Sequence, residues 1–234
     1  MSSRDKILAA VKENQPEFRE LPPLPGEPGY ASDSSNASQK SGSATSPVDA
    51  VTPDLSPEQL ASKFISVLEA IGGSAYIVSS FDRIAHILQE EHTDARRIVS
   101  GCPELASLAE TATHYDDPHT LEDIDLAILR AHFGVAENGA CWITEDRMIE
   151  RALPFIAQHL ALIIYKKDIV ANMHEAYERI ANAEKDGAAY GFATFIAGPS
   201  KTADIEQSLV LGAHGPRSMT VFLLDEEMSD AGFY

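Results

Sequence analysis

The sequence is poor in cysteine and has no long apolar run. Cys102 and Cys141 are the only two cysteines in 234 residues, and they form no Cys-x-x-Cys motif. Two thiolates are too few to hold an iron–sulfur cluster alone, and their scarcity argues for a reducing compartment. The longest apolar run, residues 160–165, is far shorter than the roughly 20 residues that cross a bilayer, and no signal peptide is recognisable. We therefore expect a cytoplasmic protein without membrane insertion, with both cysteines in its core.

Basic side chains are also scarce. The chain has 18 Lys and Arg residues against 36 Asp and Glu residues, which gives a net charge of −18. Such a charge repels phosphate backbones and anionic lipids, so nucleic acid is excluded as an expected partner. The chain has neither a Walker motif nor a Gly-x-Gly-x-x-Gly fingerprint, so no common nucleotide motif is present either.

Composition divides the chain into three parts. Residues 1–15 carry Ile7, Leu8 and Val11 at helical spacing and predict a short amphipathic helix. Residues 16–55 are rich in Pro and Ser and bury too little apolar surface to offset the entropy of ordering, which predicts a flexible linker. The whole chain has 44% hydrophobic residues, enough for a sizeable core. Residues 56–234 are expected to form one folded domain.

Within this domain apolar runs of strand length alternate with helical spacing, which is typical of an α/β protein with a mainly parallel sheet flanked by helices. A Ser-Pro-Glu start at Ser56 predicts the first helix. The expected strands are residues 75–78, 97–100, 126–129, 132–136, 160–165, 192–197 and 219–224, and the expected helices are residues 56–71, 81–91, 147–153, 169–183 and 203–211. Asn138-Gly139 between two apolar runs predicts a β-hairpin insertion with a type I′ turn.

One segment, residues 198–216, stands out as a candidate binding site. It reads Gly-Pro-Ser-Lys-Thr-Ala-Asp-Ile-Glu and ends in Leu-Val-Leu-Gly-Ala-His-Gly-Pro. A tight loop before a helix over residues 203–211 would present free backbone N–H groups beside a lysine and two hydroxyls, which suits a carboxylate or phosphate. The alternative is that the hydroxyls only cap the helix and the lysine is solvated. The candidate ligand-binding residues are Gly198, Ser200, Lys201, Thr202, Asp204 and His214, with Asp204 expected to fix the loop.

This segment, together with Val-Ala-Glu-Asn-Gly at residues 135–139, resembles the signature of the lactate-utilization protein C family, the LUD domain. The resemblance spans roughly residues 56–225. It implies the fold that this family shares with sugar-phosphate isomerases and coenzyme A transferases. It also implies a cytosolic subunit of an iron–sulfur L-lactate oxidation system, with no cofactor on this chain and the clusters on two partner proteins. The chain would then bind a small organic anion or its partner subunits.

Two other functions stay open. Coenzyme A transferases of similar fold use a glutamate in a Glu-x-Gly turn as nucleophile, which makes Glu137 a catalytic candidate in a stand-alone enzyme acting on an acyl or phosphorylated compound. The alternative is that Glu137 is a turn or pocket residue. An assembly scaffold that recruits partners through residues 1–15 is the third function. His114, Asp116, Asp117 and His119 could hold a metal, but ordinary loop chemistry is the preferred interpretation, so no metal site is predicted.

Overall fold

The computed structural model describes residue 4 and residues 55–112, 114–115, 117–203 and 209–225. The chain divides into two units between Val51 and Thr52, and the following description concerns the second. The predicted N-terminal helix and the predicted linker therefore lie outside the described residues, apart from Arg4 and Leu55. No described helix is long and apolar enough to span a membrane.

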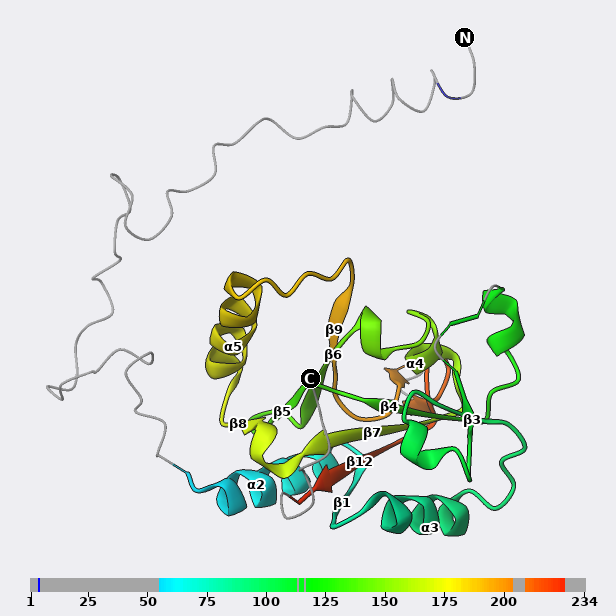
Figure 1. The fold of residues 1–234 in the computed structure, drawn as a ribbon, viewed down its shortest axis with the longest axis horizontal. Coiled ribbons are helices and arrows are strands. Elements are labelled where there is room, and N and C mark those ends of the chain that lie inside the picture. Colours follow the sequence, from blue (N-terminus) through cyan, green and yellow to red (C-terminus); the bar gives the residue numbers. More distant parts are fainter. Residues whose placement is uncertain (1–3, 5–54, 113, 116, 204–208, 226–234) are drawn as a thin grey trace, which may run out of the picture. The chain divides into compact units, whose positions relative to one another are not determined.

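A six-stranded, entirely parallel sheet forms the centre of the domain, in the order β1-β12-β7-β4-β2-β3. The neighbouring strands β12, β7 and β4 are buried almost throughout, as expected for a parallel sheet covered on both faces. The predicted α/β fold with a mainly parallel sheet is confirmed (Figure 1). The strands are β1 (Ser74–Val78), β2 (Ile98–Ser100), β3 (Glu110–Thr111), β4 (Leu126–Arg130), β7 (His159–Tyr165) and β12 (Ser218–Leu224).

Two helices begin where the sequence predicts them. Helix α2 (Pro57–Ala70) starts with a capping box in which the Ser56 side chain accepts from the backbone N–H of Gln59 and the Gln59 side chain accepts from that of Ser56. Helix α3 (Phe81–Glu91) starts after Ser80, which accepts from the backbone N–H of Arg83. Both helices place apolar residues at helical spacing against the sheet.

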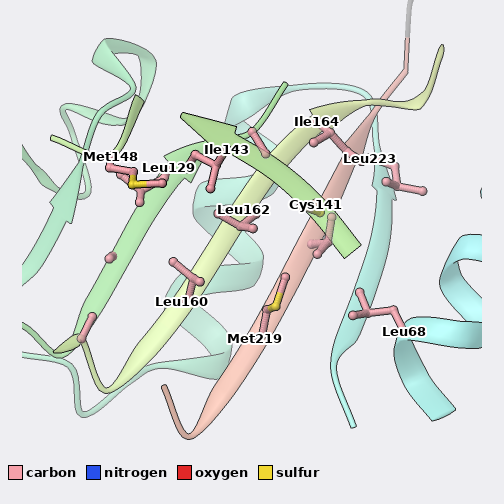
Figure 2. Packing of buried hydrophobic residues seen from close by; sticks show 14 of the residues in the cluster. Leu68, Leu129, Cys141, Ile143, Met148, Leu160, Leu162, Ile164, Met219 and Leu223 are labelled. Carbon is pink, nitrogen blue, oxygen red and sulfur yellow. The ribbon is translucent and has the colours of Figure 1, made fainter. Parts of the chain in front are cut away.

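Helices α2 and α3 cover opposite faces of the sheet. Phe64 and Leu68 of α2 pack with Leu129, Leu162 and other residues of one face (Figure 2). On the other face, α3 packs with Leu126, Ile128, Ala161, Ile163 and Phe222. Cys141 lies in the first cluster and Cys102 in the second, so the predicted burial of both cysteines is confirmed.

The hairpin insertion belongs to a second sheet, in the order β8-β5-β6-β9. Strands β5 (Phe133–Val135) and β6 (Ala140–Thr144) form the predicted hairpin; β8 (Ile169–Val170) and β9 (Ala193–Ile196) flank it. One face joins the core around α2 through residues such as Cys141 and Ile143. Helix α5 (Met173–Lys185) packs on the other face against Phe133 and Val135.

The predicted type I′ turn is wrong, although the hairpin is right. Val135 pairs with Ala140, so the loop has four residues, and the N–H of Gly139 donates to the carbonyl of Val135 at 2.9 Å (N···O). Gly139 has φ 68°, but Asn138 does not have a positive φ. Its side-chain Oδ1 instead accepts from the N–H of Ala140 at 3.1 Å, a local bond that fixes the turn.

Three predicted helices differ from the structure. Residues 145–156 form a 3-10 turn (Glu145–Arg147) and a short helix α4 (Leu153–Ile156) in place of one helix over 147–153. The helix predicted over 169–183 begins only at Met173, because Ile169–Val170 pair with β5 as strand β8. The helix predicted over 203–211 is wrong at both described ends: Lys201–Ala203 (β10) and Leu209–Leu211 (β11) pair as antiparallel strands.

The approach of the hairpin loop to α2 gives a first testable prediction. A Cβ added to Gly139 would lie 3.0 Å from the Leu68 Cα and 3.1 Å from its nitrogen, and both are backbone atoms that cannot move aside. At Gly187, which also has positive φ, nothing lies within 4 Å. We expect Gly187→Ala to lower the free energy of unfolding by about 1–2 kcal/mol through backbone strain. Gly139→Ala should cost about 1–3 kcal/mol more through overpacking, as measured by urea denaturation. Equal losses would show that the contact with α2 does not limit this position.

Candidate functional site

The candidate binding segment, residues 198–216, begins and ends at the amino edge of the parallel sheet. The N–H of Ser200 donates to the carbonyl of Pro216 at 2.9 Å (N···O), and the Ser200 carbonyl accepts from the N–H of Gly212 at 3.0 Å. The N–H of Arg217 donates to the carbonyl of Gln158, and these two residues directly precede β12 and β7. The backbone N–H of Ser200 is therefore occupied by the loop itself, and the helix start that was to supply free N–H groups is replaced by strand β10.

The side chains of this loop have structural neighbours. Lys201 lies against Gly72, just after the C-terminus of α2: its Nζ is 3.0 Å from the place that a Cβ on Gly72 would take. The helix dipole attracts a cation to this end of the helix. Ser200 packs against Gly215, and Gly198, with φ 70°, lies against Ile71. His214 is exposed, and Asp204 lies outside the described residues. The structure thus brings Gly198, Ser200 and Lys201 to one place; their ligand-binding role stays a prediction without its predicted helix.

Glu137 caps a helix. Its Oε2 accepts from the backbone N–H of Met173 at 2.8 Å, the first residue of α5, while the Asn172 side chain accepts from the N–H of Glu175 at 2.9 Å. The carboxylate thereby satisfies one of the unpaired N–H groups at the positive end of α5. This contact supports the alternative that Glu137 is a turn residue, because capping α5 is a structural reason for a carboxylate at this position.

The His114–His119 segment has local partners as well. His114 Nδ1 lies 2.5 Å from Glu150 Oε1, and Asp117 Oδ1 accepts from the N–H of His119 at 2.9 Å. Asp116 lies outside the described residues. Within the part of the chain that the structure describes, no three His, Cys, Asp or Glu side chains are grouped as metal ligands. The loop interpretation of this segment therefore accounts for the contacts that are seen.

A different cluster, which the sequence did not single out, lies at the carboxyl edge of the sheet. The chain leaves β2 toward the face covered by α3, through the 3-10 turn Pro103–Leu105, and it leaves β4 toward the opposite face, through the β5–β6 hairpin. This point between β2 and β4 is a topological switch point, where open α/β sheets generally bind their ligands.

Arg130 ends β4 on the α3 side of this point. One of its Nη atoms donates to Glu104 Oε1 at 2.5 Å, and its guanidinium carbon lies 5.1 Å from the centre of the Phe81 ring. Cys102 is beside it: burial raises the pKa of this thiol, and the charge of Arg130 opposes that rise. Arg130 is therefore a largely buried cation at the end of a central strand.

Arg147 approaches the same edge from the other side, with one Nη atom 3.3 Å from the carbonyl of Ala131. Among the described residues, no carboxylate lies within ion-pair distance of its guanidinium. Burial lowers the pKa of Arg147; nearby Asp146 offsets part of that effect and the charge of Arg130 adds to it. Arg147 thus carries a half-buried charge that its own chain compensates poorly.

His132 completes the cluster. Its Nε2 lies 2.5 Å from Thr144 Oγ1, and the Thr144 hydroxyl donates its single proton to Asp146 Oδ1, so Nε2 of His132 must be the donor to Thr144. Burial first, and then the charge of Arg147, lowers the pKa of His132 to about 4. The imidazole is consequently neutral near pH 7, and the positive charge of the cluster rests on the arginines.

Sequence comparison places the chain among known proteins. It is 31% identical over 189 residues to lactate utilization protein C of Shouchella clausii, a match that spans 64% of this chain and 82% of that protein. The chain belongs to the lactate utilization protein C family. The LUD domain matches residues 118–224, which include both the carboxyl-edge cluster and the Ser200 loop. The predicted family is confirmed.

Two further lactate utilization proteins C and one solved structure are also similar to the chain. The protein of Exiguobacterium sp. is 26% identical over 194 residues, covering 77% of this chain and 84% of its own. The Bacillus pumilus protein is 30% identical over 117 residues, about half of each chain. The crystal structure of a DUF162 family protein from Deinococcus radiodurans shares the fold, with a TM-score of 0.55 and 18% identity over 73% of this chain and 99% of that one.

The contact of Glu137 separates a capping role from a catalytic one. Glu137→Ala should lower the free energy of unfolding by about 1 kcal/mol, because it leaves the N–H of Met173 without its acceptor. Glu137→Gln keeps an acceptor oxygen and should lose clearly less. Glu178→Ala on the exposed side of α5 serves as the control for helix propensity. A capping role is contradicted if all three variants unfold like the parent in urea.

His132 predicts a pH dependence of stability. Its pKa is about 4 in the folded chain against 6.5 as the ordinary value, so on acidification the unfolded chain takes up the proton first. The stability linked to this residue is complete above pH 6.5 and is lost as the pH falls toward 4. His132→Gln, which keeps an N–H donor for Thr144, should show a smaller loss of unfolding free energy between pH 7 and pH 5. His174→Gln, at an exposed site on α5, should behave like the parent.

Proposed function

We propose that this protein is the non-cluster component of an iron–sulfur system that oxidises L-lactate, and that it works beside partners that carry the clusters. The observation that carries the proposal is its membership of the lactate utilization protein C family over most of the length of the Shouchella clausii protein. The names of these relatives connect them with lactate utilization. The role as a subunit is the further step that we propose, together with binding of a small organic anion or of partner subunits.

The cysteines support a role without a cluster of its own. Cys102 and Cys141 lie in separate core clusters on the two faces of the sheet. Burial raises the pKa of both thiols, so neither is poised as a thiolate ligand. Since a cluster generally takes four protein ligands, the clusters of the proposed system belong on the partner proteins.

Exposed apolar side chains support contact with a partner. Among the described residues, large exposed apolar side chains include Phe155 and Ile156 of α4 and Val210 and Leu211 of β11. The last two belong to the Leu-Val-Leu-Gly-Ala-His-Gly-Pro segment of the family signature. Their exposure means that core packing does not explain them, whereas an interface would.

The stand-alone enzyme acting through Glu137 is not favoured, because the carboxylate already caps α5. Its direct check is to incubate the purified protein with an acyl coenzyme A and look by mass spectrometry for an adduct on Glu137. The scaffold acting through residues 1–15 concerns residues outside the described part of the chain, so it stays a prediction. A cytoplasmic location also stays a prediction.

The proposal is tested in cells that grow on L-lactate. Affinity purification of the tagged protein should recover cysteine-rich iron–sulfur proteins, and deletion of its gene should abolish growth on L-lactate but not on glucose. Leu211→Ser should lower the recovery of these partners, whereas Ile77→Ser, an equally exposed site on β1, should not. Recovery of no cluster-bearing protein, together with normal growth of the deletion strain, would refute the proposed function.

A further inference from the structure

The carboxyl-edge cluster is the part of the fold that the proposed function has not used. Arg130, His132 and Arg147 come from the end of β4, from the residue before β5 and from the turn after β6. Arg147 reaches the carbonyl of Ala131, the residue between the other two, so all three lie near the switch point between β2 and β4. We propose that Arg130 and Arg147 bind the carboxylate of a small organic monoacid at this edge of the sheet, with His132 beside it.

The charge of the cluster is the first argument. The protein as a whole carries a net charge of −18, yet Arg147 reaches the carbonyl of Ala131, the residue after Arg130, and the charge of Arg130 helps to lower the pKa of Arg147. Arg130 has Glu104 as a partner, whereas among the described residues Arg147 has no carboxylate within ion-pair distance. Holding a half-buried guanidinium in this way costs stability, and an anion placed between the two side chains removes that cost. Guanidinium groups match carboxylates through paired N–H donors.

The number of charges favours a monoanion. Arg130 is paired with Glu104, and Arg179 of α5 is paired with Asp168 at 2.6 Å. Arg147 is the arginine of this cluster that has no carboxylate partner among the described residues, and one added negative charge would pair it. Asp146 and Asp168 lie close enough to influence Arg147, so a phosphate dianion would meet more repulsion than a monocarboxylate.

Backbone strain is an independent argument. Ile149 has φ 66°, a left-handed conformation that is costly for a β-branched residue, and its side chain lies 3.6 Å from the Cβ position of Gly101. Gly101 directly follows β2, so the strained turn borders the switch point. Strain of this kind persists where the surrounding structure holds a site in a required geometry.

The groups around the cluster are apolar on one side and include a possible acceptor on the other. Phe81 covers one side of Arg130, and Ile149 lies over Gly101 at the end of β2. His132 holds its Nε2 proton toward Thr144, which leaves its Nδ1 as an acceptor for a hydroxyl group. A short acid with a hydroxyl near its carboxylate can therefore use the arginines and the histidine together. This inference depends on the proposed function only for the choice of L-lactate as first probe.

The test measures binding to the purified full-length protein, with L-lactate, pyruvate, acetate and inorganic phosphate as probes. Isothermal titration calorimetry should detect L-lactate or another monocarboxylate more strongly than phosphate. Arg147→Gln should weaken that binding about 10- to 100-fold, the usual effect of losing charged hydrogen bonds, and Arg147→Lys should weaken it less. Arg96→Gln, an exposed arginine at the amino edge of the sheet, is the matched control and should bind like the parent.

A second readout needs no variant. A carboxylate bound beside Arg147 raises the pKa of His132 from its low value, so the His132 ring signals in NMR should shift on saturation with the probe. Groups facing His132 that also affect its charge are Arg147, Asp146, Arg179 and Asp168. The inference is overturned if no monocarboxylate binds, if phosphate binds more tightly, or if Arg147→Gln binds like Arg96→Gln. Such a result leaves the recovery of cluster-bearing partners and the growth phenotype unaffected, so the two proposals fail separately.

Discussion

The burial of β4, β7 and β12 on both faces is the constraint from which the other features of the domain follow. Every residue of these strands except those at the ends is buried, so each face needs its own cover. Helix α3 with the turn after β2 covers one face, and α2 with the second sheet covers the other. Chain segments must therefore leave neighbouring strands in opposite directions somewhere, and they do so between β2 and β4. The position of the arginine cluster is a consequence of how the core is covered.

The parts of the fold that follow from local pattern could be predicted from the sequence. Helix α3 and strand β12 coincide with their expected ranges within one residue, since caps and apolar spacing are written in adjacent residues. The helix expected over 203–211 failed for a corresponding reason. Ile205 and Leu209 have helical spacing, but Thr202 and Val210 are β-branched, and the pairing of Lys201–Ala203 with Leu209–Leu211 decides the structure of both ends.

The site depended on contacts between distant residues. Asn138-Gly139 predicts a turn from adjacent residues. The approach of Gly139 to Leu68 and the hydrogen bond from the N–H of Met173 to Glu137 instead join segments that no local sequence pattern connects. Arg130 did give a signal: it is a charged residue at the end of a buried parallel strand, followed closely by His132. Placing Arg147 beside it required the register of the β5–β6 hairpin and the turn after it. Electrostatic partners of this kind appear only once the chain is folded.

The two edges of the sheet differ in structure. The Gly-Pro-Ser-Lys-Thr segment lies at the amino edge, where the N–H of Ser200 donates to the carbonyl of Pro216, Lys201 lies against the C-terminus of α2, and apolar residues of β11 are exposed. At the carboxyl edge, Arg147 has no carboxylate within ion-pair distance among the described residues; it contacts the carbonyl of Ala131, next to the Arg130–Glu104 pair, and the strained turn at Ile149 borders the same switch point. The Gly-Pro-Ser-Lys-Thr segment of the family signature thus lies at the amino edge, whereas the carboxyl-edge cluster, where we propose a ligand site, comes from residues that form no contiguous motif. Our proposal places a small acid where Arg147 lacks a carboxylate partner among the described residues, and not at the segment with the family signature.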